Sequence, residues 1–303
     1  MSLKYSFELF PPRNEAAGAR LKNTIQAFSS ISPEFVSVTF GAGGSHSRAS
    51  LSVLQQLVDA GLDPMAHLTC VGLGVEEAGR LVRSFLDAGI TKFLALRGDL
   101  PDDPREQRTE LQSAAELVQL IEGVDTERVP YEHVPLPGLR AASIRERRQN
   151  VEIAVAAFPN GHPTSGARRN DVDALLAKQN SGATLAITQL FFDPYDYLEF
   201  VDLARARGVT IPILPGIVIP TTLRRLQRSA ELSGERIPIA LAEQLDGASP
   251  EDGGRIGVDA AVAIIEELRD HDVQHIHLYT FNHHRPSFDT LTAVDAITPI
   301  GAQ

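Results

Sequence analysis

The sequence predicts an α/β protein, a single-domain (β/α)8 TIM barrel that spans residues 1–303. Short apolar runs alternate with amphipathic segments along the chain, a pattern typical of strands that alternate with helices. The runs are apolar at successive positions, so both faces of each strand are expected to be buried, as in a parallel sheet covered by helices. Eight such units fit the usual size of a closed barrel, about 250 residues.

The predicted strands are short segments rich in β-branched and aromatic residues. They are 5–10, 35–40, 65–70, 92–98, 152–158, 185–192, 211–217 and 275–281. Predicted helices lie between them, and several end at a glycine, which suits a left-handed C-cap. They are 51–61, 76–89, 111–123, 194–208 and 257–271.

An open doubly wound sheet is the alternative fold. Its dinucleotide-binding fingerprint needs glycines at fixed spacing between a strand and a helix. The cluster GAGG at 41–44 has His46 where the third glycine is required, and GLG at 72–74 has no third glycine at that spacing. The barrel is therefore preferred, and it needs no second domain.

One segment, at about 124–149, interrupts the alternation of strands and helices. It is rich in proline and charge, and it connects a predicted helix to the fifth strand. Helix-to-strand connections of a barrel lie on its N-terminal face, opposite the usual active site. We therefore expect the insertion to serve stability or a contact within a homo-oligomer, and not to act as a catalytic lid.

Composition narrows the range of partners. The formal net charge is −11 and no stripe of lysine and arginine offsets it, which argues against nucleic acid. The single cysteine, Cys70, excludes a disulfide within the chain and indicates a reducing compartment. We find no signal peptide and no apolar run long enough to span a membrane, so we expect a cytoplasmic protein without a membrane partner.

Polar residues near the carboxyl ends of barrel strands are the first catalytic candidates. Any one of them could make only a structural hydrogen bond, but several that converge on one mouth of the barrel favour a function. The candidates are Glu8, Thr39, His67, Thr69, Arg97, Gly98, Asp99, Gln189, His277 and Tyr279.

Glu8 is the most unusual candidate, because it lies inside the apolar run YSFELFPPR. Strand alternation places its side chain in the barrel interior with Ser6 and Phe10. Burial there favours the protonated acid, which is the state that a general acid requires. The alternative is a structural glutamate paired with Arg13 or Arg97, and position alone does not decide between the two.

The late histidines raise the alternative of a metal-dependent barrel hydrolase. His275 and His277 lie two apart on one predicted strand and therefore share a face. A barrel hydrolase usually carries its His-x-His pair on the first strand, where this chain has Glu8. No HExxH, cysteine cluster or G-x-S-x-G motif occurs, so we expect no metal site and no nucleophilic hydrolase.

Together the motifs resemble those of the methylenetetrahydrofolate reductase family, the flavin enzymes of one-carbon metabolism. The matching motifs occur in the family's order and cover nearly the whole chain outside the insertion. They are SFELFPPR at 6–13, FVSVTFGAGGS at 35–45, AHLTCVG at 66–72, ALRGDLP at 95–101, AAFPNGHP at 156–163, AITQLFFD at 186–193, ILPGI at 213–217 and LYTFN at 278–282.

The resemblance implies FAD at the C-terminal mouth and an oxidoreductase reaction of methionine biosynthesis. NAD(P)H would reduce the flavin, and methylenetetrahydrofolate would then take the hydride and become 5-methyltetrahydrofolate. The resemblance assigns Glu8 as the general acid that opens the folate, Asp99 as a catalytic group near flavin and folate, and Gln189, Tyr279 and Leu223 as substrate contacts. It assigns contacts with FAD to Thr39, His67, Arg97, Gly98, Asp99, Phe158, His162, Asp171 and Lys178.

Several positions depart from the family's best-known bacterial pattern. Phe158 stands where a tyrosine is common beside the flavin, and Ala174 and Ala177 replace polar or charged residues on the helix that faces the FAD phosphates. Each lost charge-assisted contact would weaken FAD binding by about 1–3 kcal/mol. A second hypothesis follows, a reductase of the same fold that passes hydride directly from NADH to the pterin.

Other departures concern the folate. Leu223 replaces an aromatic residue that stacks on substrate, and His283 replaces an arginine near the folate. Arg168 and Arg169 could restore charge near the phosphates. A non-catalytic binding paralogue is a further alternative, against which the retained Glu8 counts. No 2′-phosphate pocket can be identified, so the sequence leaves open the choice between NADH and NADPH.

Overall fold

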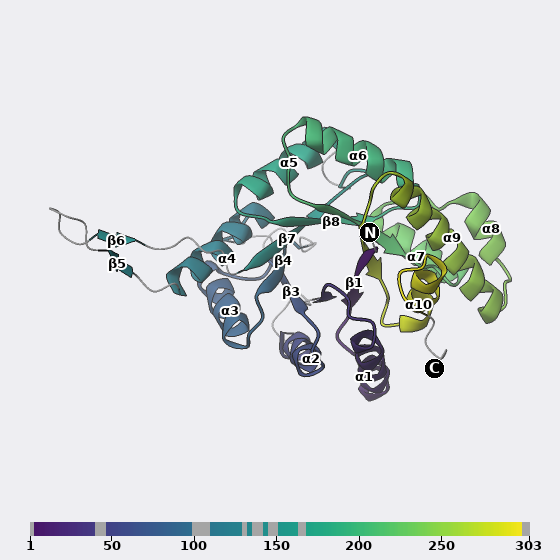
Figure 1. Cartoon of the computed structure of the whole chain (residues 1–303), viewed down its shortest axis with the longest axis horizontal. Coiled ribbons are helices and arrows are strands. Elements are labelled where there is room, and N and C mark those ends of the chain that lie inside the picture. The colour runs from purple at the N-terminus through teal and green to yellow at the C-terminus, as the bar shows by residue number, and fades with distance from the viewer. Residues whose placement is uncertain are drawn as a thin grey trace.

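A computed structural model describes residues 3–39, 47–98, 110–128, 132–134, 142–144, 151–162 and 168–298 of the chain. Its strands are β1 (Lys4–Leu9), β2 (Val36–Val38), β3 (Pro64–Thr69), β4 (Lys92–Leu96), β5 (Glu132–Val134), β6 (Ala142–Ile144), β7 (Glu152–Ala157), β8 (Leu185–Leu190), β9 (Ile213–Val218) and β10 (His275–Tyr279). Within these residues, eight parallel strands close into a barrel in the order β1-β10-β9-β8-β7-β4-β3-β2. The helices surround this barrel (Figure 1), so the predicted (β/α)8 TIM barrel is confirmed.

Helices follow the barrel strands in the sequence and cover the outer face of the barrel. They are α1 (Glu15–Ser29), α2 (Ser47–Asp59), α3 (Val75–Asp87), α4 (Ala114–Arg128), α5 (Arg168–Asn180), α6 (Pro194–Ala206), α7 (Leu223–Ser233), α8 (Ile239–Leu245), α9 (Pro250–Asp270) and α10 (His284–Ala293). Local sequence explains several helix starts. Asn14 accepts a hydrogen bond from the Ala17 amide at the start of α1, and Asp193 accepts one from the Tyr195 amide at the start of α6. No helix in the described part of the chain is long and apolar enough to cross a membrane.

The start of α9 differs from the prediction of a helix over 257–271. The helix begins seven residues earlier, at Pro250, because Ser249 caps it and the proline suits its first turn. The sequence did not predict this start because Gly253 and Gly257 follow it, and glycine disfavours a helix. Both are required by packing: a Cβ at Gly253 would lie 2.5 Å from the Thr221 carbonyl oxygen. The helix backbone thus lies directly against the chain that leaves β9.

The core has two parts. The larger cluster fills the space between the barrel and its helices, and it includes Phe7, Phe28 and Phe93, all 0% exposed. A smaller cluster fills the barrel interior toward its N-terminal end. It consists of Phe35, Met65, Leu94, Ala154, Leu185, Ile187 and Leu214. The barrel is therefore closed by apolar side chains on one side of Glu8.

The inserted connection at about 124–149 begins later than predicted. Helix α4 continues to Arg128, because Val124 and Asp125 are buried against the barrel. Strands β5 and β6 then pair as an antiparallel two-stranded sheet that projects away from the barrel (Figure 1). Because this segment connects a helix to the start of β7, it belongs to the N-terminal side of the barrel. A contact with another copy of the chain stays a prediction.

Candidate active site

Glu8 lies near the carboxyl end of β1, with its side chain inside the barrel. The residue is 8% exposed. The Thr39 hydroxyl donates a long hydrogen bond of 3.4 Å to one carboxyl oxygen, and the other lies 3.9 Å from Nε2 of His67. Neither Arg13 nor Arg97 forms an ion pair with it. The alternative of an arginine-paired structural glutamate is therefore not supported.

Burial sets the charge state of this group. Loss of solvent raises the pKa of Glu8 to about 7, and the hydrogen bond from Thr39 lowers it only in part. Burial also lowers the pKa of His67 to about 3, so its imidazole is neutral. The 3.9 Å approach is therefore no ion pair. At neutral pH a large fraction of Glu8 keeps its proton, as a general acid requires.

His67 presents an unused polar atom at the mouth. The side chain is 4% exposed, and within the described residues its Nε2 has no hydrogen-bond partner. A buried imidazole nitrogen without a partner is costly, and a native structure usually supplies one. His67 is thus placed to hydrogen-bond a molecule that enters the mouth beside Glu8.

Tyr279 lies next to Glu8 in the register of β1 and β10. Its hydroxyl donates a hydrogen bond of 2.7 Å to the Thr188 carbonyl oxygen on β8, which fixes the ring over the intervening strand β9. A Cβ at Gly216 would lie 2.5 Å from the Tyr279 ring, so the ring needs a glycine there. Burial, followed by the nearby Glu8 charge, raises the pKa of Tyr279. Because its hydroxyl is engaged, Tyr279 offers its ring to a ligand.

Of the other two predicted substrate contacts, Gln189 lies near the end of β8 and Leu223 follows β9. The pairing of β8 with β9 shifts register between Ile187 and Leu190, an irregularity of the kind that redirects side chains at barrel rims. Gln189 lies within this irregularity, where its side-chain oxygen accepts a hydrogen bond from the Leu190 amide at 3.0 Å. Leu223 is half-buried as the first residue of α7, behind the N-cap Thr222. Their contacts with substrate stay predictions.

A group of cations gathers at the ends of β4 and β7. The Lys178 ammonium group, on α5, donates a hydrogen bond of 2.7 Å to the Ala156 carbonyl oxygen. Burial lowers the pKa of Lys178 to about 8; Asp171 opposes this effect, and Arg97 adds to it. Two cations close enough to repel each other favour an anionic ligand, which would relieve the repulsion.

Aromatic residues border this group. The Lys178 nitrogen lies 5.9 Å from the centre of the Phe158 ring, and the Phe158 and His162 rings meet edge to face at 4.7 Å. The His162 amide donates a hydrogen bond of 3.1 Å to Asp171. The structure therefore brings Phe158 and His162, which share one motif, together with Asp171 and Lys178, which lie outside the quoted motifs. Gly98, with φ of +83°, follows β4 in a backbone conformation that favours glycine.

Some predicted positions cannot be compared. Asp99 lies outside the described residues, as do the side chains of Arg168 and Arg169. Ala174 and Ala177 are exposed on α5, the helix that carries Lys178.

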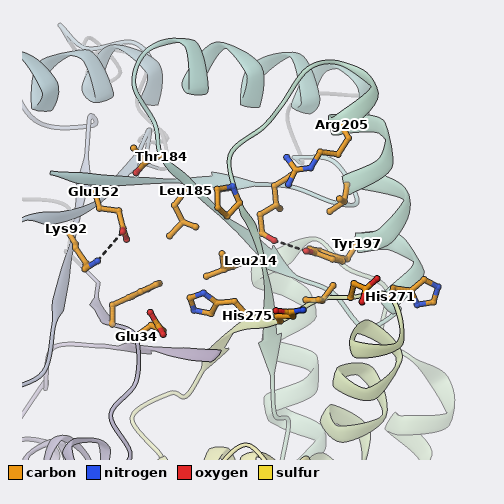
Figure 2. A pocket seen from close by; sticks show the side chains of 17 residues that line it. Glu34, Lys92, Glu152, Thr184, Leu185, Tyr197, Arg205, Leu214, His271 and His275 are labelled. Atoms are coloured by element: carbon orange, nitrogen blue, oxygen red, sulfur yellow. Dashed lines mark hydrogen bonds and ion pairs between the residues drawn. The ribbon is translucent and has the colours of Figure 1, made fainter. Parts of the chain in front are cut away.

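A pocket of about 570 Å³ (Figure 2) lies at the end of the barrel where the strands begin. Glu8, the fifth residue of β1, lies toward the other end. Its lining includes Lys92, Glu152, Leu185 and His275, each of which is the first residue of its strand. Figure 2 shows Lys92 directed toward Glu152, and the two form an ion pair of 3.1 Å. His275 therefore lies away from the mouth.

The two predicted late-strand histidines have different surroundings. His277 lies in the interior, where its Nδ1 is 2.9 Å from the Ser6 hydroxyl, and it stacks on Phe35. His275 also contacts Phe35, at the far pocket. Among the described residues, no group of three or more His, Cys, Asp or Glu side chains could hold a metal ion.

Two residues that hold the backbone around Glu8 were not predicted from the sequence. The Thr280 hydroxyl donates to the Glu8 carbonyl oxygen at 2.7 Å, and the Asn282 side chain bonds the backbone of Phe10. Both lie in the LYTFN motif, 272 residues from their partners. The sequence indicates them only as two polar residues soon after the last strand. Their partners, the backbones of Glu8 and Phe10, come close only because the barrel closes.

Comparisons with known proteins identify relatives of this chain. A family model described as methylenetetrahydrofolate reductase matches residues 1–294. The 5,10-methylenetetrahydrofolate reductase of Escherichia coli (strain K12) is 32% identical over 289 residues, which cover 94% of this chain and 88% of that protein. The protein of the same name from Pectobacterium carotovorum subsp. carotovorum is 31% identical over 283 residues, covering 92% of this chain and 86% of that protein.

More distant matches include a plant protein and a solved structure. Methylenetetrahydrofolate reductase (NADH) 1 of Arabidopsis thaliana is 28% identical over 291 residues, covering 92% of this chain and 46% of that protein. The solved structure is of an uncharacterized Clostridium thermocellum protein that binds two copies of 5-methyl-5,6,7,8-tetrahydrofolic acid. It matches with a TM-score of 0.60 at 12% identity, covering 96% of this chain and 93% of that one, and this likeness shows the fold alone.

Proposed function

The chain belongs to the methylenetetrahydrofolate reductase family, and we propose that it transfers a hydride from NAD(P)H, by way of FAD, to 5,10-methylenetetrahydrofolate. The product is 5-methyltetrahydrofolate. The reductase names of the curated relatives support the substrate. The observation that carries the proposal is the buried carboxyl group of Glu8 at the mouth, whose pKa is raised to about 7.

Glu8 supplies the proton that this reaction consumes. The one-carbon unit bridges N5 and N10 in the substrate and remains on N5 in the product, so the bond from carbon to N10 breaks. An amine leaves readily only when it is protonated. Glu8 gives its proton to N10 as this bond breaks, which leaves an iminium ion at N5 whose carbon accepts the hydride. The carboxylate then takes a proton from water before the next turnover.

The residues around the mouth fit a flavin dinucleotide. The unpartnered Nε2 of His67 offers one polar contact beside Glu8. Lys178 and Arg97, whose charges repel each other, suit the diphosphate, and Phe158 offers an aromatic face beside them. FAD, when bound, would accept a hydride from NAD(P)H and deliver it to the folate. Thr39, Gly98, His162 and Asp171 are assigned to the same site.

The rate of folate reduction is expected to fall as the pH rises above 7. Glu8 donates only when protonated, and its pKa of about 7 places the loss of its proton at that pH. Well above pH 7 the rate should therefore fall about tenfold for each further pH unit. The measurement is the initial rate of 5-methyltetrahydrofolate formation from pH 6 to 9. A rate that stays constant to pH 9 would contradict a proton donor with this pKa.

Replacing Lys178 by methionine is expected to weaken FAD binding. Methionine keeps most of the side-chain volume but removes the charge that would hold the flavin phosphates, and a charge-assisted contact contributes about 1–3 kcal/mol. The dissociation constant should rise about ten- to a hundredfold. Flavin fluorescence titration measures this constant. The matched control is Arg228→Met, an exposed cation on α7 that pairs with Glu231, which should leave FAD affinity unchanged.

The experiment that tests the proposed function is a product assay with and without FAD. Purified protein receives NADH and methylenetetrahydrofolate, and 5-methyltetrahydrofolate is quantified by chromatography. We expect product with FAD and a visible flavin spectrum that bleaches when NADH is added. Equal product from colourless protein without FAD would instead support direct hydride transfer, the alternative that exposed Ala174 and Ala177 motivate. No product under either condition would refute the reductase.

A further inference from the structure

We propose that Asn282 is a positioning residue for the Glu8 carboxyl group: its side-chain amide replaces the strand pairing that is missing beyond the end of β1, and so fixes the segment that carries Glu8. This inference rests on the proposed role of Glu8 as proton donor. Asn282 touches the backbone of Phe10, two residues after Glu8, and acts only through that backbone.

The Asn282 amide makes both hydrogen bonds that a neighbouring strand would make. The Phe10 amide donates to its side-chain oxygen at 2.8 Å, and its side-chain nitrogen donates to the Phe10 carbonyl oxygen at 2.8 Å. Pairing of β1 with β10 ends at Glu8 and Tyr279. Thr280 extends it by one bond, from its hydroxyl to the Glu8 carbonyl oxygen at 2.7 Å. The side chain of Asn282 thus continues the hydrogen-bond ladder between β1 and β10 by two more hydrogen bonds.

The chain after Phe10 cannot anchor itself by regular pairing. Pro11 and Pro12 follow, and proline has no backbone N–H to donate. On the other side, the Thr39 amide bonds the Leu9 carbonyl oxygen at 3.0 Å, but Phe10 has no such bond to β2. Within the described part of the chain, the two hydrogen bonds with Asn282 are therefore the last backbone anchors of this strand before α1.

The turn that carries Asn282 is held in a costly conformation. Phe281 and Asn282 have φ of 48° and 61°, in the left-handed region, which is costly for phenylalanine and which asparagine adopts more readily than most residues. Thr24 donates to the Asn282 carbonyl oxygen, and the Asn282 amide bonds the Thr280 hydroxyl. Backbone strain that the surroundings enforce in this way is typical of functional sites.

Substitutions at position 282 can distinguish the contribution of its left-handed backbone from that of its side-chain hydrogen bonds. Glycine would suit the left-handed backbone at least as well as asparagine. Aspartate would accept a hydrogen bond from the Phe10 amide but could not donate to the Phe10 carbonyl oxygen. Of these residues, only asparagine provides both the turn and the two hydrogen bonds.

The test compares Asn282→Gly and Asn282→Asp with the wild-type chain. Asn282→Gly keeps the turn and removes the side-chain amide. A loss of activity in this variant is therefore caused by the loss of the two hydrogen bonds to Phe10. The matched control is Ser249→Ala, which removes the N-cap of α9 and affects stability without touching β1. The measurements are hydrogen exchange of the Phe10 amide and the rate of folate reduction against pH. The titratable groups facing Glu8, His67 on β3 and Tyr279 on β10, are unchanged in all variants.

In Asn282→Gly we expect the Phe10 amide to exchange about tenfold faster or more, and the folate-reduction rate to fall about ten- to a hundredfold. The pH midpoint of that rate should move down, because a loosened strand end admits water to Glu8. Asn282→Asp should show an intermediate loss. The proposal would be overturned if Asn282→Gly matched Ser249→Ala in all three measurements. These are the exchange protection of the Phe10 amide, the rate of folate reduction and the pH midpoint of that rate. If the wild-type chain forms no product, the reductase assignment fails, and exchange of the Phe10 amide alone then decides whether Asn282 anchors the strand.

Discussion

Glu8→Gln is expected to reduce the formation of 5-methyltetrahydrofolate by about 10²–10⁴-fold, the usual contribution of a general acid. Glutamine fills the same space and can hydrogen-bond Thr39, but it cannot release a proton to N10. Oxidation of NADH with a quinone acceptor should be largely retained, because that half-reaction needs no proton from Glu8. The two rates, measured on the same preparation, separate the chemistry from the fold.

The stability of this variant is a second check. In the folded chain burial raises the pKa of Glu8 from its ordinary value of 4.5 to about 7. The native state therefore binds its proton more tightly than the unfolded chain does. Stability is lost as the pH rises from about 4.5 to about 7, by up to about 3 kcal/mol. Glu8→Gln removes this loss, so it should be the more stable protein at pH 8. Equal loss of both half-reactions in a less stable variant would show a structural role for Glu8.

Gly216→Ala is expected to destabilise the barrel by about 3 kcal/mol or more, an overpacking effect. A Cβ there would lie 2.3 Å from the Thr188 carbonyl oxygen and 2.5 Å from the Tyr279 ring. The first neighbour is backbone, and the Tyr279 ring is held by its hydrogen bond to that same oxygen. The Thr188 carbonyl group cannot move without disturbing β8, and the Tyr279 ring cannot move without disturbing the site beside Glu8. Thermal or urea unfolding measures the loss.

Gly254→Ala is the matched control for this change. Gly254 lies within α9, and a Cβ there would meet nothing within 4 Å. Alanine should therefore leave stability unchanged or raise it by about 1 kcal/mol, because it favours the helix. If Gly216→Ala unfolds at the same urea concentration as Gly254→Ala, the close contact between Gly216 and Tyr279 does not constrain the protein.

The strand pattern was predictable because parallel barrel strands are apolar on both faces. The run around Glu8 shows this: Phe7 and Leu9 face the helices, and Glu8 faces the interior, as alternation requires. Helix α9 was predicted less well, because Gly253 and Gly257 are set by contacts with the chain after β9 and not by helix propensity.

The site was predictable only in part. Alternation alone placed Glu8 in the interior, but it could not exclude an arginine partner, since that depends on which strands meet at the mouth. The group of Lys178, Arg97 and Phe158 came from the resemblance and needed the fold to show that its members meet. Asn282 was missed because its hydrogen bonds join the two ends of the barrel sequence.

Titration of Glu8 itself tests most directly whether this residue is the proton donor. Protein labelled with carbon-13 in its glutamate carboxyl groups is titrated by NMR from pH 3 to 9, and the Glu8 signal is identified by its absence in Glu8→Gln. We expect a midpoint at about pH 7, because burial without a cationic partner favours the protonated acid. A midpoint near the ordinary value of a glutamate, below pH 5, would mean that Glu8 is ionised at neutral pH and cannot be the proton donor.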